Sequence, residues 1–212
     1  MESDIQQPVS RAERKKQELR REIIDAAFAC FADQGYHATG IADIAARLGI
    51  GHGTFYRYFD NKRDIVEHVV TDIIERIVGT LTAENAPDAV STLADYRTQS
   101  ARIGEGLSRI LLEDPRAARL LLVEAAGIDK QMADRVLGFI EFATTLTAAY
   151  LTHGVELGYL RADLDVDNSA RAINGMVLGS TIASLQNPDI DHRQMSEAIR
   201  VVMYDGISAR SD

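Results

Sequence analysis

A glycine turn joins two short amphipathic segments within residues 41–59, and few folds accommodate that arrangement. An apolar spacing of i, i+3, i+4 and i+7 predicts a helix of about two turns over Ile41, Ile44, Ala45 and Leu48. Gly49 then suits the left-handed conformation that ends a helix. A second short helix is expected from about His52 to Phe59, with Phe55 buried beside Phe59. This pattern predicts a helix-turn-helix, whose second helix enters the major groove of DNA with its N-terminus first.

The rest of the chain also has helical periodicity. Apolar residues recur every four positions in a predicted helix from about Arg14 to Gly35. Asn61 is expected to cap a fourth helix that runs toward Thr80. Asp114, followed by a proline, is expected to open a helix that stops at Gly127. Later helices are predicted over residues 130–158, 166–186 and 191–207.

The predicted fold class is all-α, because no segment alternates as a strand does. We expect an N-terminal three-helix helix-turn-helix domain and a C-terminal helical domain for ligand binding and dimerisation. The predicted boundaries are a disordered N-terminal arm over residues 1–13, the DNA-binding domain over 14–66 and the second domain over 67–212. Residues 85–113 are left open as one helix or two, since Gly104 and Gly106 interrupt the pattern.

Charge is unevenly distributed along the chain. The formal net charge is −9, yet residues 1–66 hold ten basic and ten acidic side chains, so the excess acid lies in residues 67–212. An acidic C-terminal part repels DNA and helps orient the protein on it. The basic run over residues 11–21 is either a solvated helix face or an arm that binds phosphate or the minor groove. Its position beside a helix-turn-helix favours the arm, with Arg14 and Lys15 as candidate contacts.

The residue types at the start of the second short helix suit DNA binding. Glycine lets the backbone approach DNA closely, and free N–H groups attract phosphate. The candidates at this leading end are Gly51, His52, Gly53 and Thr54. Long polar tips for phosphate contacts follow at Tyr56, Arg57 and Tyr58, with Lys62 at the start of the fourth helix.

The segment ATGIADIAARLGIGHGTFYRYFDNKRDI, residues 38–65, resembles the signature of the TetR family of transcriptional repressors. The run from Gly53 to Phe59 matches nearly letter for letter, and the likeness extends over roughly residues 14–66. The resemblance implies a ligand-responsive repressor that a small, largely apolar molecule releases from its operator. Activation or co-repression in place of repression is left open.

The resemblance also implies roles for individual residues. Residues 50–59 are the implied recognition helix, and Thr39 and Gly40 lie where the helix meets the DNA backbone. Phosphate contacts are implied for Tyr56, Tyr58 and Lys62. The chain departs from the family in having Gly40 and Gly51 at caps where the family usually has Ser or Thr, and His52 where it often has lysine. Side-chain hydroxyl contacts are therefore not expected from the two glycines.

The predicted helix over residues 166–186 has no polar face, so both of its sides are expected to be buried. We expect its small side to pack against the same helix of a second copy, with residues 191–207 completing a four-helix homodimer interface. The predicted interface residues are Ala172, Gly175, Gly179, Ala183, Met195, Ile199 and Val202. The alternative is a helix at the centre of a monomer. A two-fold dimer reads two half-sites on operator DNA.

An effector pocket is expected among the helices of residues 87–158, since small-molecule sites are mostly apolar with a few polar groups. Helical phase selects Tyr96, Arg102, Phe139, Phe142, Tyr150 and His153 as lining candidates. For His153 a buried structural role is the competing interpretation. A rival function for the whole chain is a small-molecule binding or adaptor protein of the same fold without specific DNA affinity.

Other functions lack the motifs they need. Cys30 is the single cysteine, which excludes an intrachain disulfide and a cysteine-based zinc site. Asp163, Asp165 and Asp167 resemble the start of a calcium loop, but Asn168 replaces its glycine, so a turn and a helix cap are expected instead. We expect no metal, no cofactor and no enzyme activity. Without a signal peptide or a membrane span in the sequence, a cytoplasmic location is expected.

Overall fold

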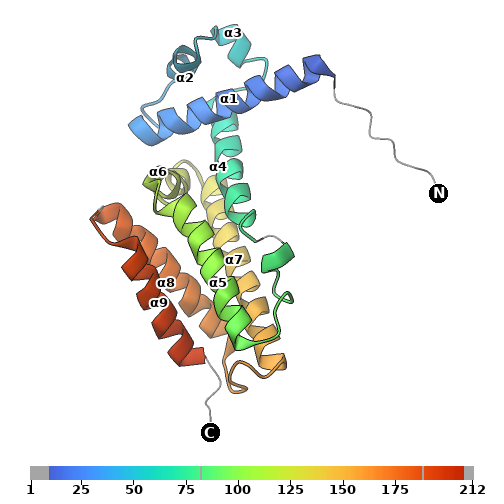
Figure 1. Ribbon diagram of the computed structural model, residues 1–212. Coiled ribbons are helices and arrows are strands. Elements are labelled where there is room, and N and C mark those ends of the chain that lie inside the picture. The colour runs from blue at the N-terminus through green and yellow to red at the C-terminus, as the bar shows by residue number, and fades with distance from the viewer. Residues whose placement is uncertain (1–9, 82, 188, 208–212) are drawn as a thin grey trace, which may run out of the picture. The chain divides into compact units, whose positions relative to one another are not determined.

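The computed structural model describes residues 10–81, 83–187 and 189–207 (Figure 1). Within these ranges the chain forms nine α-helices and no β-strand, which confirms the all-α prediction. The chain divides into two compact units, residues 1–71 and 72–212, and the division falls inside helix α4 (Lys62–Val78). The boundary thus lies five residues after the one expected from sequence.

The first unit contains α1 (Arg11–Gln34), α2 (Ile41–Leu48), α3 (His52–Phe55) and the start of α4. Local signals set the helix ends: the Ser10 hydroxyl caps α1, and Gly35 and Gly49 follow α1 and α2 with φ of 84° and 68°. Only glycine adopts such angles without strain. The largest fully buried side chains of this unit are Ile23, Phe31, Ile44, Phe55, Phe59 and Ile65.

Two expectations for this unit need correction. Helix α1 begins at Arg11, so the basic run is part of a helix and not of an arm. The rest of the predicted arm, residues 1–9, lies outside the described residues. The recognition helix is also shorter than predicted, since α3 ends at Phe55. Beyond it the chain continues in a tighter turn, in which Arg57 and Tyr58 donate to carbonyls three residues back.

The second unit holds the remainder of α4, α5 (Leu93–Leu111), α6 (Pro115–Arg119), α7 (Lys130–Glu156), α8 (Val166–Gln186) and α9 (His192–Ile207). Helix α8 contacts α6, α7 and α9 (Figure 1). A 3-10 turn, η1 (Ala83–Asn85), precedes α5 and contacts it. These contacts pack one side of α8 against the rest of the second unit.

Residues 85–113 contain a single long helix, α5, preceded by the turn η1, which settles the question left open by the sequence. Gly104 and Gly106 are both accommodated inside this helix. At Gly106 an added Cβ would lie 2.8 Å from the Thr80 side chain, so a tertiary contact explains this glycine. Periodicity along the chain does not reveal such a contact.

The predicted caps in the second unit are confirmed. Asp114 caps α6, and Pro115 occupies its first position. After α6 the chain widens into a π-helical turn (Leu120–Glu124) and ends in a 3-10 turn (Ala125–Gly127). Asp165 caps α8 by accepting the backbone N–H of Asn168, as expected for the acidic turn.

Among the helices that the structure describes, none has both the length and the apolar character that a bilayer crossing requires. Within the same residues, no three His, Cys, Asp or Glu side chains gather where they could hold a metal ion.

Candidate functional site

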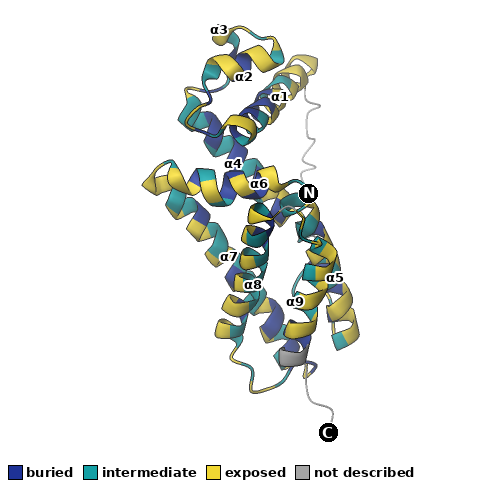
Figure 2. Cartoon of the chain, turned by 90° about the vertical axis from the view of Figure 1, so that its left-hand side faces the viewer, coloured by how far each residue is buried: buried dark blue, intermediate teal, exposed yellow. Residues whose placement is uncertain are grey.

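The segment after α2 has one buried side and one exposed side. Phe55 and Phe59 are buried, with ring centroids 5.8 Å apart, and they anchor the segment to the core of the first unit. On the other side Tyr56 is 53% exposed, and Arg57 is exposed next to it. Figure 2 shows that much of the chain around α3 is exposed. This pair of aromatic anchors therefore holds a polar surface in solvent. Of the predicted leading end, the residues exposed are Gly51, His52 and Gly53, while Thr54 is half-buried.

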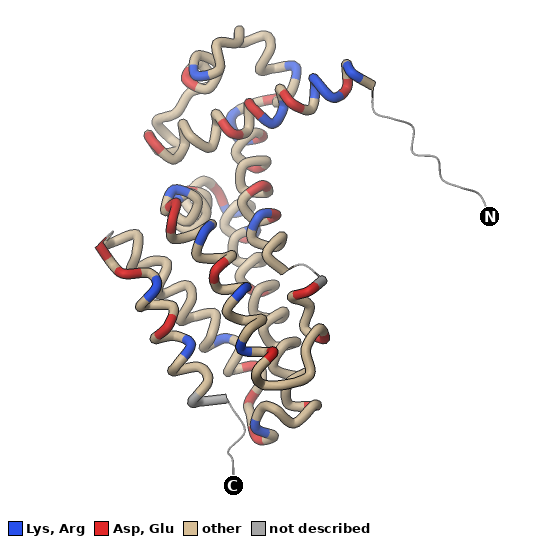
Figure 3. Tube along the Cα trace, viewed as in Figure 1, with Lys and Arg blue, Asp and Glu red and all other residues tan. Residues whose placement is uncertain are grey.

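This unit has exposed basic side chains in two regions, at Arg57 and near the start of α1. The guanidinium carbon of Arg57 lies 5.9 Å from the ring centroid of Tyr58, a half-buried residue, so the ring supports the cation without covering it. Arg14 and Lys15 are exposed on α1, and Figure 3 shows Lys and Arg gathered toward the N-terminal end of that helix. Both regions offer cations to a phosphate backbone.

Thr39 does not fit the predicted contact with DNA through its side chain. Only 1% of the residue is exposed, and its hydroxyl shares its single proton between the carbonyls of Cys30 and Gly35, at 3.1 and 2.8 Å. The hydroxyl therefore fastens the loop between α1 and α2. Gly40 is half-buried at the cap of α2, where its N–H donates to the Asp43 carboxylate at 2.7 Å.

Lys62 also has a role different from the phosphate contact that the resemblance implies. Its ammonium group donates to three backbone carbonyls, and it lies 4.5 Å from the ring centroid of Tyr36. The acceptors and distances are Tyr36 at 2.9 Å, His37 at 3.3 Å and Thr39 at 2.9 Å. An ammonium has three protons, so these bonds use all of them. In this arrangement Lys62 ties the first residue of α4 to the loop before α2, and no donor remains for a phosphate.

Sequence reasoning missed a further contact that holds α4, this time to α1. Arg20 extends a guanidinium nitrogen to within 3.1 Å of the His68 ring nitrogens, and its guanidinium carbon lies 5.1 Å from the Phe59 ring centroid. The His68 ring meets Phe59 edge-on at 5.4 Å. Because Arg20 and His68 are 48 residues apart, no local spacing predicts their contact.

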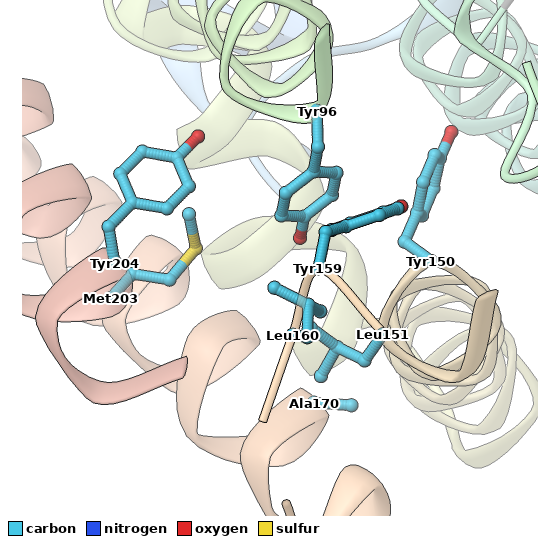
Figure 4. Close-up of a cluster of buried hydrophobic side chains, with 8 residues drawn as sticks. All are labelled: Tyr96, Tyr150, Leu151, Tyr159, Leu160, Ala170, Met203 and Tyr204. Carbon is cyan, nitrogen blue, oxygen red and sulfur yellow. The ribbon is translucent and has the colours of Figure 1, made fainter. Parts of the chain in front are cut away.

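A cluster of buried side chains occupies the core of the second unit (Figure 4). Its polar members are four tyrosines, and the other members are apolar. The residues that form this tyrosine cluster are Tyr96, Tyr150, Leu151, Tyr159, Leu160, Ala170, Met203 and Tyr204. Tyr96 is central, with ring centroids 5.8 Å from Tyr159 and 6.3 Å from Tyr204.

The tyrosine cluster is uncharged at neutral pH. Burial raises the pKa of Tyr96 strongly, and the neighbouring phenols add to the effect. Burial also raises the pKa of Tyr150, Tyr159 and Tyr204. Each phenol consequently keeps its proton and can donate a hydrogen bond.

Of the six predicted effector residues, the structure brings three together. Tyr96 and Tyr150 belong to the tyrosine cluster, and the His153 ring lies 6.5 Å from that of Tyr159. His153 Nε2 is 2.8 Å from the carbonyl of Val90, as the structural interpretation of this residue requires. These three side chains remain candidates to line an effector site.

The other three candidates lie elsewhere. Arg102 is exposed and donates to Asn85 Oδ1 at 3.2 Å, so it braces the turn η1. Phe142 is 49% exposed, and Phe139 is half-buried. The helical phase was wrong for this part of α7, whose buried stripe runs through Met132, Val136, Thr144 and Leu151. At about 100° per residue, Phe142 lies nearly opposite Thr144.

Sequence reasoning also missed Gln99, Tyr159 and Tyr204. Gln99 is fully buried one turn beyond Tyr96 on α5, and that spacing was the available signal. Tyr159 follows α7 in a turn, and Tyr204 lies on α9, where its hydroxyl pairs with Ser100 at 2.5 Å. Nothing local marks a turn tyrosine as part of a core that α5 completes.

The predicted dimer residues lie on an open face of the single chain. At Gly175 and Gly179 an added Cβ would meet no atom within 4 Å. Ala172 is exposed, and Val202 is 64% exposed. Half-buried positions in the same set include Ala183, Met195 and Ile199. An open pocket of about 310 Å³ lies beside this face, with Ala172 and Val202 in its lining and none of the predicted effector residues.

Comparison with known proteins identifies the N-terminal segment. Residues 23–69 match the family profile described as bacterial regulatory proteins, tetR family. This segment is therefore similar to the N-terminal part of TetR-family regulators. Its curated TetR relatives are regulators, and the matched residues run from the middle of α1 into the first half of α4.

The TetR likeness extends over most of the chain. The fatty acid metabolism regulator protein of Bacillus subtilis (strain 168) is 22% identical, with 92% of this chain and 98% of the relative covered. The HTH-type transcriptional regulator TtgR of Pseudomonas putida is 27% identical, with coverage of 85% and 87%. The structure of SmeT, the repressor of the Stenotrophomonas maltophilia multidrug efflux pump SmeDEF, matches with a TM-score of 0.72 at 23% identity and 91% coverage of both chains. The TetR architecture of two helical domains is thereby confirmed.

Proposed function

We propose that this protein binds operator DNA as a homodimer, represses transcription there, and is released when a small, largely apolar molecule binds its C-terminal domain. The observation that best supports this proposal is the exposed surface over residues 51–58, which two fully buried phenylalanines hold in place. Residues 14–66 are the proposed DNA-binding domain, and residues 67–212 bind effector and partner. Regulation, not catalysis, is the proposed activity, and its place is the cytoplasm, where bacterial operator DNA lies.

Charge supports DNA binding by the first unit. The acid excess lies in residues 67–212, so the N-terminal segment is not repelled from phosphate as a whole. Arg57, Arg14 and Lys15 are exposed cations, and Tyr56 adds an exposed hydroxyl. Phosphate contacts of this kind set the register of the protein on DNA, and contacts from the leading end of the segment read bases. We assign the base-reading role to His52 and Thr54.

Operator binding is tested by fluorescence anisotropy with the DNA upstream of the protein's own gene. We expect a Kd of about 10 nM or tighter, at least about 10³-fold tighter than for a scrambled duplex, and a steep loss of affinity as salt rises. Arg57→Gln should lower the slope of log K against log salt by about 0.9 per protomer. Equal affinity for both duplexes would instead support the adaptor function without specific DNA binding.

The effector proposal rests on the uncharged core of the second unit. Tyr96, Tyr150 and His153 place polar tips among apolar side chains, the composition that small-molecule sites share. Two structural relatives of similar fold are a SmeT–triclosan complex and FadR from Bacillus subtilis in complex with stearoyl-CoA. A ligand shifts operator occupancy only if it binds one state more tightly than the other.

Dimerisation is tested at Gly179. The small side of α8 lets two copies approach closely, and Ile182, 42% exposed, adds apolar surface. Gly179→Glu would place two unpaired carboxylates in the interface, so we expect a shift from dimer to monomer in light scattering at micromolar concentration. Gly138→Glu on α7, where an added Cβ likewise meets no atom within 4 Å, is the matched control and should remain dimeric. A wild-type monomer, or a dimeric Gly179→Glu variant, would contradict the proposed interface.

A further inference from the structure

Residues 84–90, which run from η1 toward α5, form a strap held by side chains of α5 and α7. Three of these side chains each reach one strap carbonyl: Gln99 reaches Ala86 at 2.8 Å, His153 reaches Val90 at 2.8 Å, and the Tyr150 hydroxyl donates to Asn85. All three also border the tyrosine cluster or belong to it. The strap thus fixes the orientation of polar groups at the edge of this core.

Two polar atoms in this region are buried without a hydrogen-bond partner among the described residues: Gln99 Oε1 and the Tyr159 hydroxyl. Gln99 is fully buried, and Tyr159 is 9% exposed. Both flank Tyr96, since Gln99 is one helical turn away on α5 and the Tyr159 ring packs against the Tyr96 ring. In Figure 4 the Tyr159 ring extends from the turn toward Tyr150. Buried polar atoms are nearly always hydrogen-bonded, so these two atoms are available to pair with a bound molecule, whether water or ligand.

The amide orientation of Gln99 is settled by the strap. Its Nε2 donates to the carbonyl of Ala86, and a flipped amide would bring two oxygens together. Oε1 is therefore an acceptor in need of a donor. The Tyr159 phenol keeps its proton, so it can both donate and accept.

The surroundings define the chemical class of the partner. The tyrosine cluster contains no Asp, Glu, Lys or Arg, so a charged ligand would be buried without a counter-charge inside it. The guanidinium carbon of Arg97 lies outside this cluster, 5.0 Å from the ring centroid of Tyr204. Its aromatic rings favour a flat aromatic body. A hydroxyl can donate to an amide oxygen and can both donate to and accept from a phenol.

We propose that the region around Tyr96, Gln99 and Tyr159 is a binding site for a neutral hydroxylated aromatic molecule, whose hydroxyl groups pair with Gln99 Oε1 and the Tyr159 hydroxyl. The site deepens the proposed function by naming the class of effector. The role of this site as the effector site rests on the proposed function. Binding of a hydroxylated aromatic molecule at the site does not depend on that function.

The test is equilibrium dialysis of the full-length protein at pH 7 with phenol, 2-naphthol, naphthalene and 2-naphthoate. These probes separate the hydroxyl from the ring and from a negative charge. We expect 2-naphthol to bind at least about tenfold more tightly than naphthalene or 2-naphthoate, the difference that one well-made hydrogen bond produces. The proposal is overturned if neither phenol nor 2-naphthol binds, or if naphthalene binds as tightly as 2-naphthol.

Tyr159→Phe isolates the unpartnered hydroxyl. The variant should bind 2-naphthol less tightly than the wild type does, since only Gln99 Oε1 remains to pair with the ligand's hydroxyl. Its Tm should stay equal to that of the wild type or rise, because the change removes an unsatisfied polar atom. Tyr204→Phe is the matched control within the cluster: it removes a hydroxyl that pairs with Ser100, so Tm should fall while 2-naphthol binding persists. A fall in Tm for Tyr159→Phe with unchanged 2-naphthol binding would assign this hydroxyl a purely structural role and overturn the proposal.

Failure of this proposal is distinguishable from failure of the proposed function. Operator binding is measured without any probe, so loss of specificity there refutes the regulator function alone. If operator binding is specific and the hydroxylated probes do not bind, the regulator function stands and the assigned ligand class is wrong.

Discussion

Replacing Lys62 with methionine is expected to weaken operator binding about tenfold, a change of about 1.4 kcal/mol, without altering the salt dependence of binding. The methionine keeps a long, flexible side chain but removes the donor for the carbonyls of Tyr36, His37 and Thr39. The loop before α2 would then be released from α4, so the proposed DNA-contacting surface over residues 51–58 would be held less firmly. If Lys62 bound a DNA phosphate, its removal would instead lower the salt slope by about 0.9 per protomer.

Arg57→Gln is the comparison that makes the Lys62 result interpretable. Arg57 is exposed, so its removal should reduce the salt slope and leave Tm nearly unchanged. Lys62→Met should leave the salt slope unchanged and lower the Tm. The Tm should fall because a hydrogen bond to a charged group contributes about 1.5–3 kcal/mol to stability. A reduced slope and an unchanged Tm for Lys62→Met would restore the phosphate-binding role that the family resemblance implies.

Gly154→Ala is expected to lower the free energy of unfolding by about 1–3 kcal/mol, the usual cost of overpacking a core. An added Cβ would lie 2.5 Å from Leu160 Cδ1 and 2.7 Å from Tyr159 Cε2. Both side chains are buried, so neither can move aside freely. Urea unfolding monitored by circular dichroism measures the change.

Gly138→Ala is the matched control on the same helix. An added Cβ at Gly138 would meet no atom within 4 Å, so alanine should raise the free energy of unfolding by about 0.5–1 kcal/mol through helix propensity. Opposite signs for the two substitutions support close packing of the turn after α7. Stabilisation by both would contradict it.

Local patterns along the chain predicted much of the first unit. The spacing of Ile44 and Ala45, the left-handed Gly49 and the pair Phe55 and Phe59 follow from side-chain size and backbone freedom, which are local properties. The exposed Arg57 follows too, because at about 100° per residue it lies nearly opposite both phenylalanines. The extent of α3 did not follow, since a one-residue change in hydrogen-bond pattern separates a helix from a tighter turn.

Contacts between residues that are far apart in the chain were not predicted from the sequence. The sequence alone determined that the chain is helical, where its helices are capped, and that residues 41–59 hold a DNA-reading motif. The tertiary structure alone decided that Lys62 and Thr39 bond to backbone carbonyls, that Phe142 faces outward, and that Tyr159 packs against Tyr96. The physical reason is that helix periodicity repeats every 3.6 residues along one element, whereas the pairing of side chains depends on which helices pack together.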